Sequence, residues 1–403
     1  MTWLELGPDH LFGLGNLPYG SFVDSQGRRH SALRIGDYAL SLTRATDALA
    51  GEHATLFADG SLDRFLAAGR PAWTAVRSLA ASWLTDEAHR PAVEALLTPL
   101  DGLELVLPFT VGDYVDFYAS EQHATNVGRI FRPGQEPLTP NWKHLPIGYH
   151  GRSGTVVVSG TNVRRPVGQA RDADGSIVFG PSRRLDLEAE VGFVVGSGSA
   201  LGEPVPLAAF ADHVFGVCLV NDWSARDIQA WEYVPLGPFL GKSFATSASA
   251  WITPLDALAA ARVPGPQRDP APLPYLDDTS QPWGLDIDIE VRLNGELISR
   301  PRFAGMYWTP AQMLAHLTVN GASVRPGDLF ASGTVSGPGR HERGSLLELA
   351  WGGTQPLVLA DGSTRTFLDD GDEVVLSASA PGPRGARIGL GEVRGGITPA
   401  RSG

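Results

Sequence analysis

The sequence contains one cysteine, a minority of basic residues and no long apolar run. Cys218 has no second cysteine to pair with and lies in the apolar stretch 214–220, so we expect a small core side chain in a reducing compartment. The net charge of -12 argues against binding to nucleic acid or to anionic membranes. The absence of a membrane-length segment and of a signal peptide predicts a cytoplasmic protein that makes no membrane contact.

The composition is that of a folded globular protein. Hydrophobic residues make up 43% of the chain and charged residues 19%, so a sizeable core can form. The 48 glycines and 31 prolines are scattered between short apolar runs, which favours many strands joined by tight turns. We therefore predict a mainly β protein with some α-helix.

The length of 403 residues favours two domains over one. The first hundred residues combine a candidate strand at 32–35 with helical patterns at 62–66 and 73–84. Beyond residue 107, Gly, Pro, Trp and Tyr recur between alternating or apolar strand candidates. These differences predict an N-terminal domain with helical segments over residues 1–107 and a larger domain over 108–403.

Two glutamates lie on one face of the strand-like stretch 185–191. Alternate side chains of an extended chain share a face, so Glu188 and Glu190 point together while their neighbours point the other way. The apolar residues 192–195 follow directly, which indicates that the strand enters a buried core. Two buried anions need a cation, and oxygen donors without sulfur or clustered imidazole favour calcium, magnesium or manganese.

Asp116 and Asp222 can complete an oxygen-only metal shell with these glutamates, although each acid is also compatible with a solvated charge on a strand or loop. Asp222 follows the apolar run 214–220, where we expect a strand to give way to a helix. Ser224 and Asp227 have the spacing of a capping box for that helix. The helix would present Arg226 and Gln229, three residues apart, on one face.

Three other residues suggest chemistry. His123 falls with Asp116 and Tyr118 in a segment that we expect to form a loop, although a lone histidine is more often a hydrogen-bonded core or surface side chain. Lys242 follows a glycine, but the spacing fails the phosphate-loop motif, which leaves a fixed cation beside the site or a surface lysine. Glu348 stands among apolar neighbours, either as a solvent-facing residue or as a buried group that orients a base.

Several stretches resemble the fumarylacetoacetases, the fumarylacetoacetate hydrolases of tyrosine breakdown. The longest match covers residues 221–229 and 231–244, and it contains the sequence Asn-Asp-Trp-Ser-Ala-Arg-Asp-Ile-Gln. Shorter matches cover 116–118, 122–128, 140–142, 145–152, 306–308, 320–321 and 325–328. The similarity is strong over residues 108–398 and weaker before them.

This resemblance implies a small N-terminal domain of SH3-like barrel type and a larger mixed β-sheet catalytic domain of β-roll type, assembled as a homodimer. It assigns a calcium site to Asp116, Glu188, Glu190 and Asp222 and a magnesium position to the neighbourhood of Lys242 and Thr246. Substrate contacts are assigned to Tyr118, Arg132, Tyr149, Gln229, Tyr233 and Thr334. His123 would be the base, oriented by Glu348, and the tetrahedral alkoxide would be stabilised by Arg226, Gln229 and Lys242.

The implied reaction is hydrolysis of the carbon–carbon bond of 4-fumarylacetoacetate, a small diketo acid, to fumarate and acetoacetate. His123 would activate water, and the divalent metal would stabilise the enolate leaving group. One alternative is a metal-dependent hydratase, decarboxylase or tautomerase of keto acids, which does not need the pair of His123 and Glu348. The other is a calcium-stabilised binding module, which has no use for the donors that surround Asp222.

Overall fold

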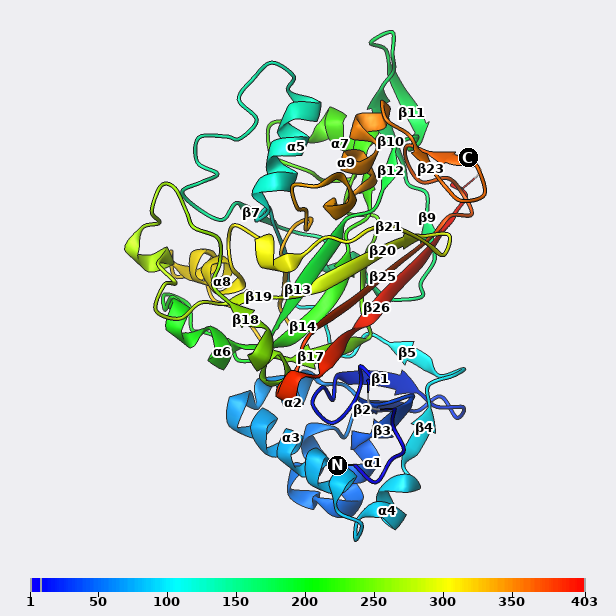
Figure 1. Ribbon diagram of the computed structural model, residues 1–403, viewed down its shortest axis with the longest axis vertical. Helices are drawn as coiled ribbons and strands as arrows, with labels where there is room; N and C mark the ends of the chain where they lie inside the picture. The colour runs from blue at the N-terminus through cyan, green and yellow to red at the C-terminus, as the bar shows by residue number, and fades with distance from the viewer. Residues whose placement is uncertain (1, 8, 402–403) are drawn as a thin grey trace.

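The computed structural model describes residues 2–7 and 9–401, and it divides into a smaller N-terminal part and a larger body (Figure 1). The N-terminal part combines short strands with four α-helices. Its strands are β1 (Tyr19–Val23), β2 (Arg29–Ile35), β3 (Tyr38–Ser41), β4 (Leu97–Pro99) and β5 (Glu104–Val106). Its helices are α1 (Leu42–Leu49), α2 (Asp63–Ala67), α3 (Gly69–Thr85) and α4 (Arg90–Glu94).

One sheet of 13 strands within the described residues connects the two parts. Its main order is β4-β3-β2-β1-β17-β14-β13-β22-β6-β7, and the antiparallel pair of β1 with β17 joins the N-terminal strands to the body. The body contributes β6 (Tyr114–Phe117), β7 (Gly148–His150), β8 (Val156–Val158), β13 (Ala189–Val195), β14 (Val214–Asn221), β16 (Thr246–Ala248), β17 (Trp251–Pro254) and β22 (Leu329–Ala331). The two parts therefore share backbone hydrogen bonds as well as side-chain contacts.

A second sheet has the order β21-β20-β25-β26-β9. Its strands are β21 (Glu296–Ser299), β20 (Asp288–Leu293), β25 (Glu373–Pro381), β26 (Arg387–Thr398) and β9 (Val163–Arg164). Four two-stranded ladders complete the β-structure: β10 (Val167–Arg171) with β11 (Ile177–Pro181), β12 (Leu185–Asp186) with β15 (Ser224–Ala225), β18 (Arg262–Val263) with β19 (Gly284–Leu285), and β23 (Leu357–Val358) with β24 (Thr364–Arg365). Burial alternates along β25, because one face of this sheet packs on the core and the other does not.

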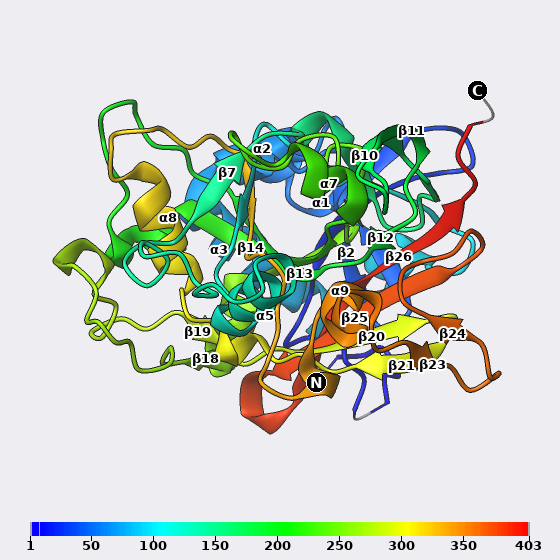
Figure 2. The ribbon, with the colours of Figure 1, turned by 90° about the horizontal axis from the view of Figure 1, so that it is seen from above.

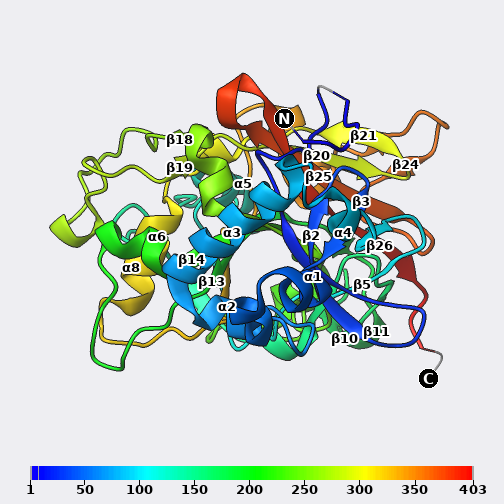
Figure 3. The ribbon, with the colours of Figure 1, turned by 90° about the horizontal axis from the view of Figure 1, so that it is seen from below.

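The strands β13 and β14 are buried on both faces, which explains why their sequences are continuously apolar. One face, with Val194 and Cys218, packs in the cluster that includes the N-terminal helices, while Phe193 and Leu219 belong to the other cluster. Figure 3 shows α2 and α3 lying across these strands. The expected core position of Cys218 is confirmed, and burial raises the pKa of its thiol to about 12.

Three helices gather at the end of the body opposite the N-terminal part (Figures 1 and 2): α5 (Glu121–Phe131), α7 (Arg226–Glu232) and α9 (Leu346–Leu349). The remaining α-helices of the body are α6 (Phe210–His213) and α8 (Pro310–Thr318). Short 3-10 helices span Gly51–Leu56, Ser153–Thr155, Leu207–Ala209, Leu255–Ala261, Pro274–Leu276, Phe303–Gly305, Arg340–Glu342, Trp351–Gly353 and Pro383–Gly385. Within the described ranges, no helix combines the length and apolar character that a membrane span requires.

The mainly β fold predicted from the sequence is confirmed, whereas the SH3-like barrel type stays a prediction. Two local expectations are wrong. His123 lies in helix α5 rather than in a loop, because the Ser120 hydroxyl caps the helix by accepting from the His123 amide. The capping box is also wrong: α7 begins at Arg226, the Ser224 hydroxyl donates to Glu188 instead, and the Asp227 carboxylate accepts from Ser182.

Candidate metal and catalytic site

Three acids from separate segments of the chain converge at one point inside the body. Asp116 lies in β6, Glu190 lies in β13, and Asp222 directly follows β14. Strand β22 lies between β6 and β13, and the antiparallel pair of β13 with β14 brings Asp222 beside Glu190. One oxygen of each carboxylate lies within 4.8 Å of the others, and all three side chains are buried. This arrangement offers an oxygen-only ligand set, which hard divalent cations prefer.

Several oxygens of this acidic triad have no hydrogen-bond partner. They are Oδ1 of Asp116 and both carboxylate oxygens of Glu190. Burial and the negative charge of Asp222 raise the pKa of Asp116 to about 6. Burial and the charges of Asp116 and Asp222 also raise the pKa of Glu190 well above its ordinary value. Buried, unpartnered carboxylate oxygens that face one another fit a bound cation, so the residues present suit the metal that the resemblance implies.

Glu188 lies beside the triad, in a different environment. Its Oε1 accepts from Arg226 Nη2 at 2.6 Å, and its Oε2 accepts from the Lys242 ammonium and the Ser224 hydroxyl. Burial alone raises the pKa of Glu188, but the charges of Arg226, Lys242 and His123 outweigh burial and hold this pKa well below its ordinary value. Glu188 is therefore neutralised by protein cations, whereas Glu190 is not.

Lys242 and Thr246, to which the resemblance assigns a second metal position, both contact Asp222. The Lys242 Nζ donates to Asp222 Oδ2 at 2.6 Å, and the Thr246 hydroxyl donates to Asp222 Oδ1 at 3.0 Å. Both side chains are buried, and Thr246 opens strand β16 next to β14. The structure thus brings the predicted cation and hydroxyl to the predicted acid.

Arg226 and Gln229 lie on one face of α7, as their spacing predicts. Arg226 donates through Nη1 to Gln229 Oε1 at 3.1 Å, through Nη2 to Glu188 and through Nε to Asp186 Oδ2 at 2.8 Å. Asp186, which the sequence reasoning missed, also accepts from the backbone amides of Leu346 and Leu347. Asp186 consequently ties Arg226 to the start of α9.

His123 and Glu348 form a buried pair. The Nδ1 of His123 lies 2.7 Å from Glu348 Oε2, and its Nε2 lies 3.6 Å from Glu188 Oε1. Glu348 also accepts from Asn126, Ser336 and Ser345, so several donors fix its carboxylate. Burial raises the pKa of Glu348, but the charge of His123 and these hydrogen bonds outweigh burial and lower it. An ionised Glu348 that faces Nδ1 favours the proton on Nδ1 and leaves Nε2 as the basic nitrogen.

Two of the predicted substrate-contact residues contact these groups directly. The Tyr118 ring meets the His123 ring edge to face at 5.4 Å, and the Tyr149 hydroxyl donates to Asp116 Oδ2 at 2.9 Å. Thr334 is buried, with its hydroxyl unpartnered. Arg132 donates through Nη2 to the backbone carbonyl of Pro137. Tyr233, at the end of α7, is 37% exposed.

Arg152 is a site residue that sequence reasoning missed. Its Nη2 donates to Asp116 Oδ2 at 2.9 Å and to Asp222 Oδ2 at 2.8 Å. The available signal was its position three residues after Tyr149, in the matched segment 145–152. With Arg152 included, the buried carboxylates exceed the buried cations by two charges, if every acid is ionised. The acids are Asp116, Asp186, Glu188, Glu190 and Asp222, and the cations are Arg152, Arg226 and Lys242. Glu348, which pairs with His123, is not in this count, and the remaining excess of negative charge favours a bound cation.

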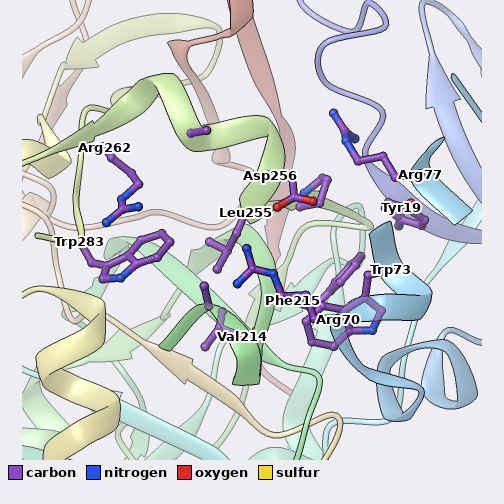
Figure 4. A pocket seen from close by; sticks show the side chains of 13 residues that line it. Tyr19, Arg70, Trp73, Arg77, Val214, Phe215, Leu255, Asp256, Arg262 and Trp283 are labelled. Atoms are coloured by element: carbon purple, nitrogen blue, oxygen red, sulfur yellow. The ribbon is translucent and has the colours of Figure 1, made fainter. Parts of the chain in front are cut away.

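A cavity of about 110 Å³ lies elsewhere, at the junction of the N-terminal part and the body (Figure 4). Trp73, Phe215 and Leu255 line it, and the Arg262 guanidinium lies 3.8 Å from the Trp283 ring centroid. None of the described residues that line this cavity belongs to the acidic triad. The candidate site is therefore defined by its buried charges rather than by this hollow.

Comparison with known proteins gives two matching family models. Residues 15–108 match the fumarylacetoacetase N-terminal model, and residues 114–398 match the fumarylacetoacetate hydrolase C-terminal model. A fumarylacetoacetase from Rattus norvegicus is 46% identical over 419 aligned positions, which cover all of both chains.

Solved structures share the fold at low sequence identity. A fumarylacetoacetate hydrolase from Exiguobacterium antarcticum superposes with a TM-score of 0.57 at 16% identity, covering 96% of this chain and 100% of the other. A maleylpyruvate hydrolase from a Sphingobium species, in complex with manganese(II) and pyruvate, has a TM-score of 0.51 at 15% identity, covering 96% and 100%. The family models and the full-length similarity establish that this chain belongs to the fumarylacetoacetase family.

Proposed function

We infer that this chain hydrolyses the carbon–carbon bond of 4-fumarylacetoacetate to fumarate and acetoacetate, the last step of tyrosine and phenylalanine degradation. The full-length similarity to a fumarylacetoacetase supports the reaction class. The observation that carries the inference is the buried pair of His123 and Glu348, whose free imidazole nitrogen faces the acidic site. A hydrolase needs such a base to activate water, whereas a structural ion site does not.

His123 acts as the general base in this proposal. Glu348 accepts the Nδ1 proton, so Nε2 takes a proton from a water molecule on the Glu188 side of the ring. The resulting hydroxide attacks the ketone next to the fumaryl group. Glu348 stays ionised, and it stabilises the imidazolium that His123 becomes.

We propose that Asp116, Glu188, Glu190 and Asp222 hold calcium, and that Lys242 and Thr246 adjoin a second position for magnesium. The oxygen-only donor set and the unpartnered oxygens of Asp116 and Glu190 support a hard divalent ion. The manganese complex of a protein with the same fold supports the same class of ion. When bound, the ion supplies Lewis acidity that stabilises the electron pair released when the carbon–carbon bond breaks.

The remaining polar residues bind the substrate and its developing charge. We propose that Arg226, Gln229 and Lys242 stabilise the tetrahedral alkoxide, because each carries a cationic or amide donor at the site. Substrate contacts are assigned to Tyr118, Arg132, Tyr149, Gln229, Tyr233 and Thr334. The unpartnered buried hydroxyl of Thr334 supports its assignment, because it retains a donor for a ligand. The protein carries a net negative charge, but the positive charges of the bound ion and of arginine at the site allow it to bind a dianionic substrate.

We further propose a cytoplasmic homodimer. The loop after α7 exposes apolar side chains, with Leu236 95%, Val234 67% and Phe239 67% exposed. Exposed apolar surface of this kind is typical of contact with another chain. The division into an N-terminal domain over 1–107 and a catalytic domain over 108–403 is also proposed. The family models support it, because one ends at residue 108 and the other begins at residue 114.

The test is to mix the protein with fumarylacetoacetate and to follow both the loss of its ultraviolet absorbance and the products. Stoichiometric fumarate and acetoacetate would support the proposal. Loss of absorbance without fumarate would instead indicate a hydratase, decarboxylase or tautomerase. Unchanged substrate, with calcium still bound to the protein, would indicate a binding module.

A further inference from the structure

We propose that Arg152 is a built-in counter-ion of the metal site, a positioning residue that holds Asp116 and Asp222 together whether or not metal is bound. One guanidinium nitrogen bridges the two acids, at 2.9 Å from Asp116 Oδ2 and 2.8 Å from Asp222 Oδ2. The Arg152 side chain is only 4% exposed. Two buried carboxylates from separate segments of the chain would otherwise repel one another.

The bridged oxygens are not the ones left available to a cation. Arg152 and the Tyr149 hydroxyl occupy Oδ2 of Asp116, while Oδ1 of Asp116 has no partner. On Asp222, Arg152 and Lys242 share Oδ2, while Oδ1 accepts only from the Thr246 hydroxyl. Arg152 therefore orients both carboxylates and leaves Oδ1 of Asp116 without a partner, as groups that position metal ligands generally do.

The guanidinium is itself held in place by aromatic rings. It lies 4.8 Å from the ring centroid of Tyr114 and 5.0 Å from that of Tyr149. The backbone of Arg152 is left-handed, with φ 59° and ψ 21°, a conformation that residues other than glycine rarely adopt. A strained backbone together with two aromatic contacts indicates that the surroundings fix this side chain in its bridging position.

Lys242 does not duplicate this role. It pairs with Glu188 and Asp222, but its contacts do not include Asp116. Arg152 is thus the cation, within the described residues, that forms an ion pair with Asp116. Without Arg152, the Tyr149 hydroxyl would be the remaining side-chain donor to Asp116, until a metal ion joined Asp116 to Asp222.

The experiment compares melting temperatures of the full chain after chelator treatment and in excess calcium chloride, for wild type and for Arg152→Met. Methionine keeps a long apolar side chain but removes the charge. Because calcium can link the same two acids, we expect Arg152→Met to lose about 5 °C more in the metal-free state than in the calcium-loaded state. The stabilisation that calcium confers should therefore be larger in the variant than in wild type.

Arg268→Met is the matched control. Arg268 forms a buried ion pair with Asp278 at 2.8 Å, with side chains 7% and 4% exposed, and it contacts none of the proposed metal ligands. This variant should lose the same number of degrees in both states. If Arg152→Met lowers the melting temperature equally in both states, the proposal is overturned, because Arg152 then has only a packing role. A larger fall in the calcium-loaded state would also overturn it.

Arg152→Lys keeps the test decisive if Arg152→Met does not fold. An ammonium retains the charge but lacks the planar fork of the guanidinium, so we expect the same sign of difference at a smaller size. Equal losses in both states would again reject the role of Arg152. The inference rests on the proposed metal site rather than on hydrolysis. If calcium, magnesium and manganese salts all fail to stabilise wild type, the metal site itself is rejected, and the activity assay remains independent of that result.

Discussion

The two sides of the buried site differ in how completely their polar groups are satisfied. On one side, Glu348 accepts from His123, Asn126, Ser336 and Ser345 and is fully enclosed. On the other side, both oxygens of Glu190 are buried without a partner. The first side is assembled by the protein alone, whereas on the second side no cation among the described residues pairs with Glu190.

The contrast is sharpest between Glu188 and Glu190, which are the same residue type two positions apart. Arg226 and Lys242 neutralise Glu188 and hold its pKa low, whereas the pKa of Glu190 is raised by burial and by neighbouring acids. A charged group remains buried only when it is paired. Glu188 is therefore held by protein cations even without a metal, whereas Glu190 depends on a bound ion for a positive partner.

The largest expected effect is on turnover, from the assembled side. His123→Ala should lower kcat by about 1,000-fold, because it removes the base while leaving the acidic triad intact. Calcium binding, measured by calorimetry on the same preparation, should stay near the wild-type affinity. Activity close to wild type would remove His123 from the mechanism, and loss of calcium binding would make the two sides of the site a single unit.

Glu188→Gln should cost about 3 kcal/mol in the free energy of unfolding, because it leaves two buried cations with one fewer carboxylate. The measurement is urea denaturation of chelator-treated protein. An unfolding free energy equal to that of wild type would contradict the role of Glu188 as the partner of these cations.

Glu190→Gln should lower calcium affinity by about 100-fold and reduce activity with it, because it removes a ligand charge. In the absence of metal this variant should be as stable as wild type or more stable, since a buried unpaired carboxylate is replaced by a neutral amide. Calorimetry and urea denaturation check the two statements separately. A metal-free variant destabilised as much as Glu188→Gln would erase the distinction between the two glutamates. In the variant that combines Glu188→Gln with Glu190→Gln, metal binding and activity should fall together. Treatment of wild type with a chelator should likewise reduce its rate.

The sequence predicts much of this site because strand periodicity is a local property. The alternation at 185–191 predicts that Glu188 and Glu190 are buried, and both are, although Glu188 lies between β12 and β13 rather than within a strand. The pairing of His123 with Glu348 is predicted only by the family resemblance, because the two residues are 225 positions apart in the chain. No local pattern contains a contact of that range.

Two of the misinterpretations have a common physical cause. The spacing of Ser224 and Asp227 predicts a capping box. In the structure the Ser224 hydroxyl donates to Glu188, and Asp227 accepts from the Ser182 hydroxyl, so tertiary hydrogen bonds replace the local one. Arg152 was missed for a related reason. An arginine after a glycine in a loop is typical of the surface, and only the fold turns it between Asp116 and Asp222.

The smallest expected effect is the pH dependence that Glu348 gives to stability. Its pKa in the folded protein is lower than in the unfolded chain, because the His123 charge and the hydrogen bonds outweigh burial. A lowered carboxyl pKa stabilises the fold above the unfolded value and loses that contribution as the pH falls through the folded value. Glu348→Gln should therefore be less stable than wild type by about 2 kcal/mol from pH 7 to about pH 5. Below about pH 4.5 the two unfolding free energies should converge, because only wild type takes up a proton on this carboxylate as it unfolds. A deficit for Glu348→Gln that stays constant down to acid pH would mean that the fold stabilises this carboxylate no better than the unfolded chain does.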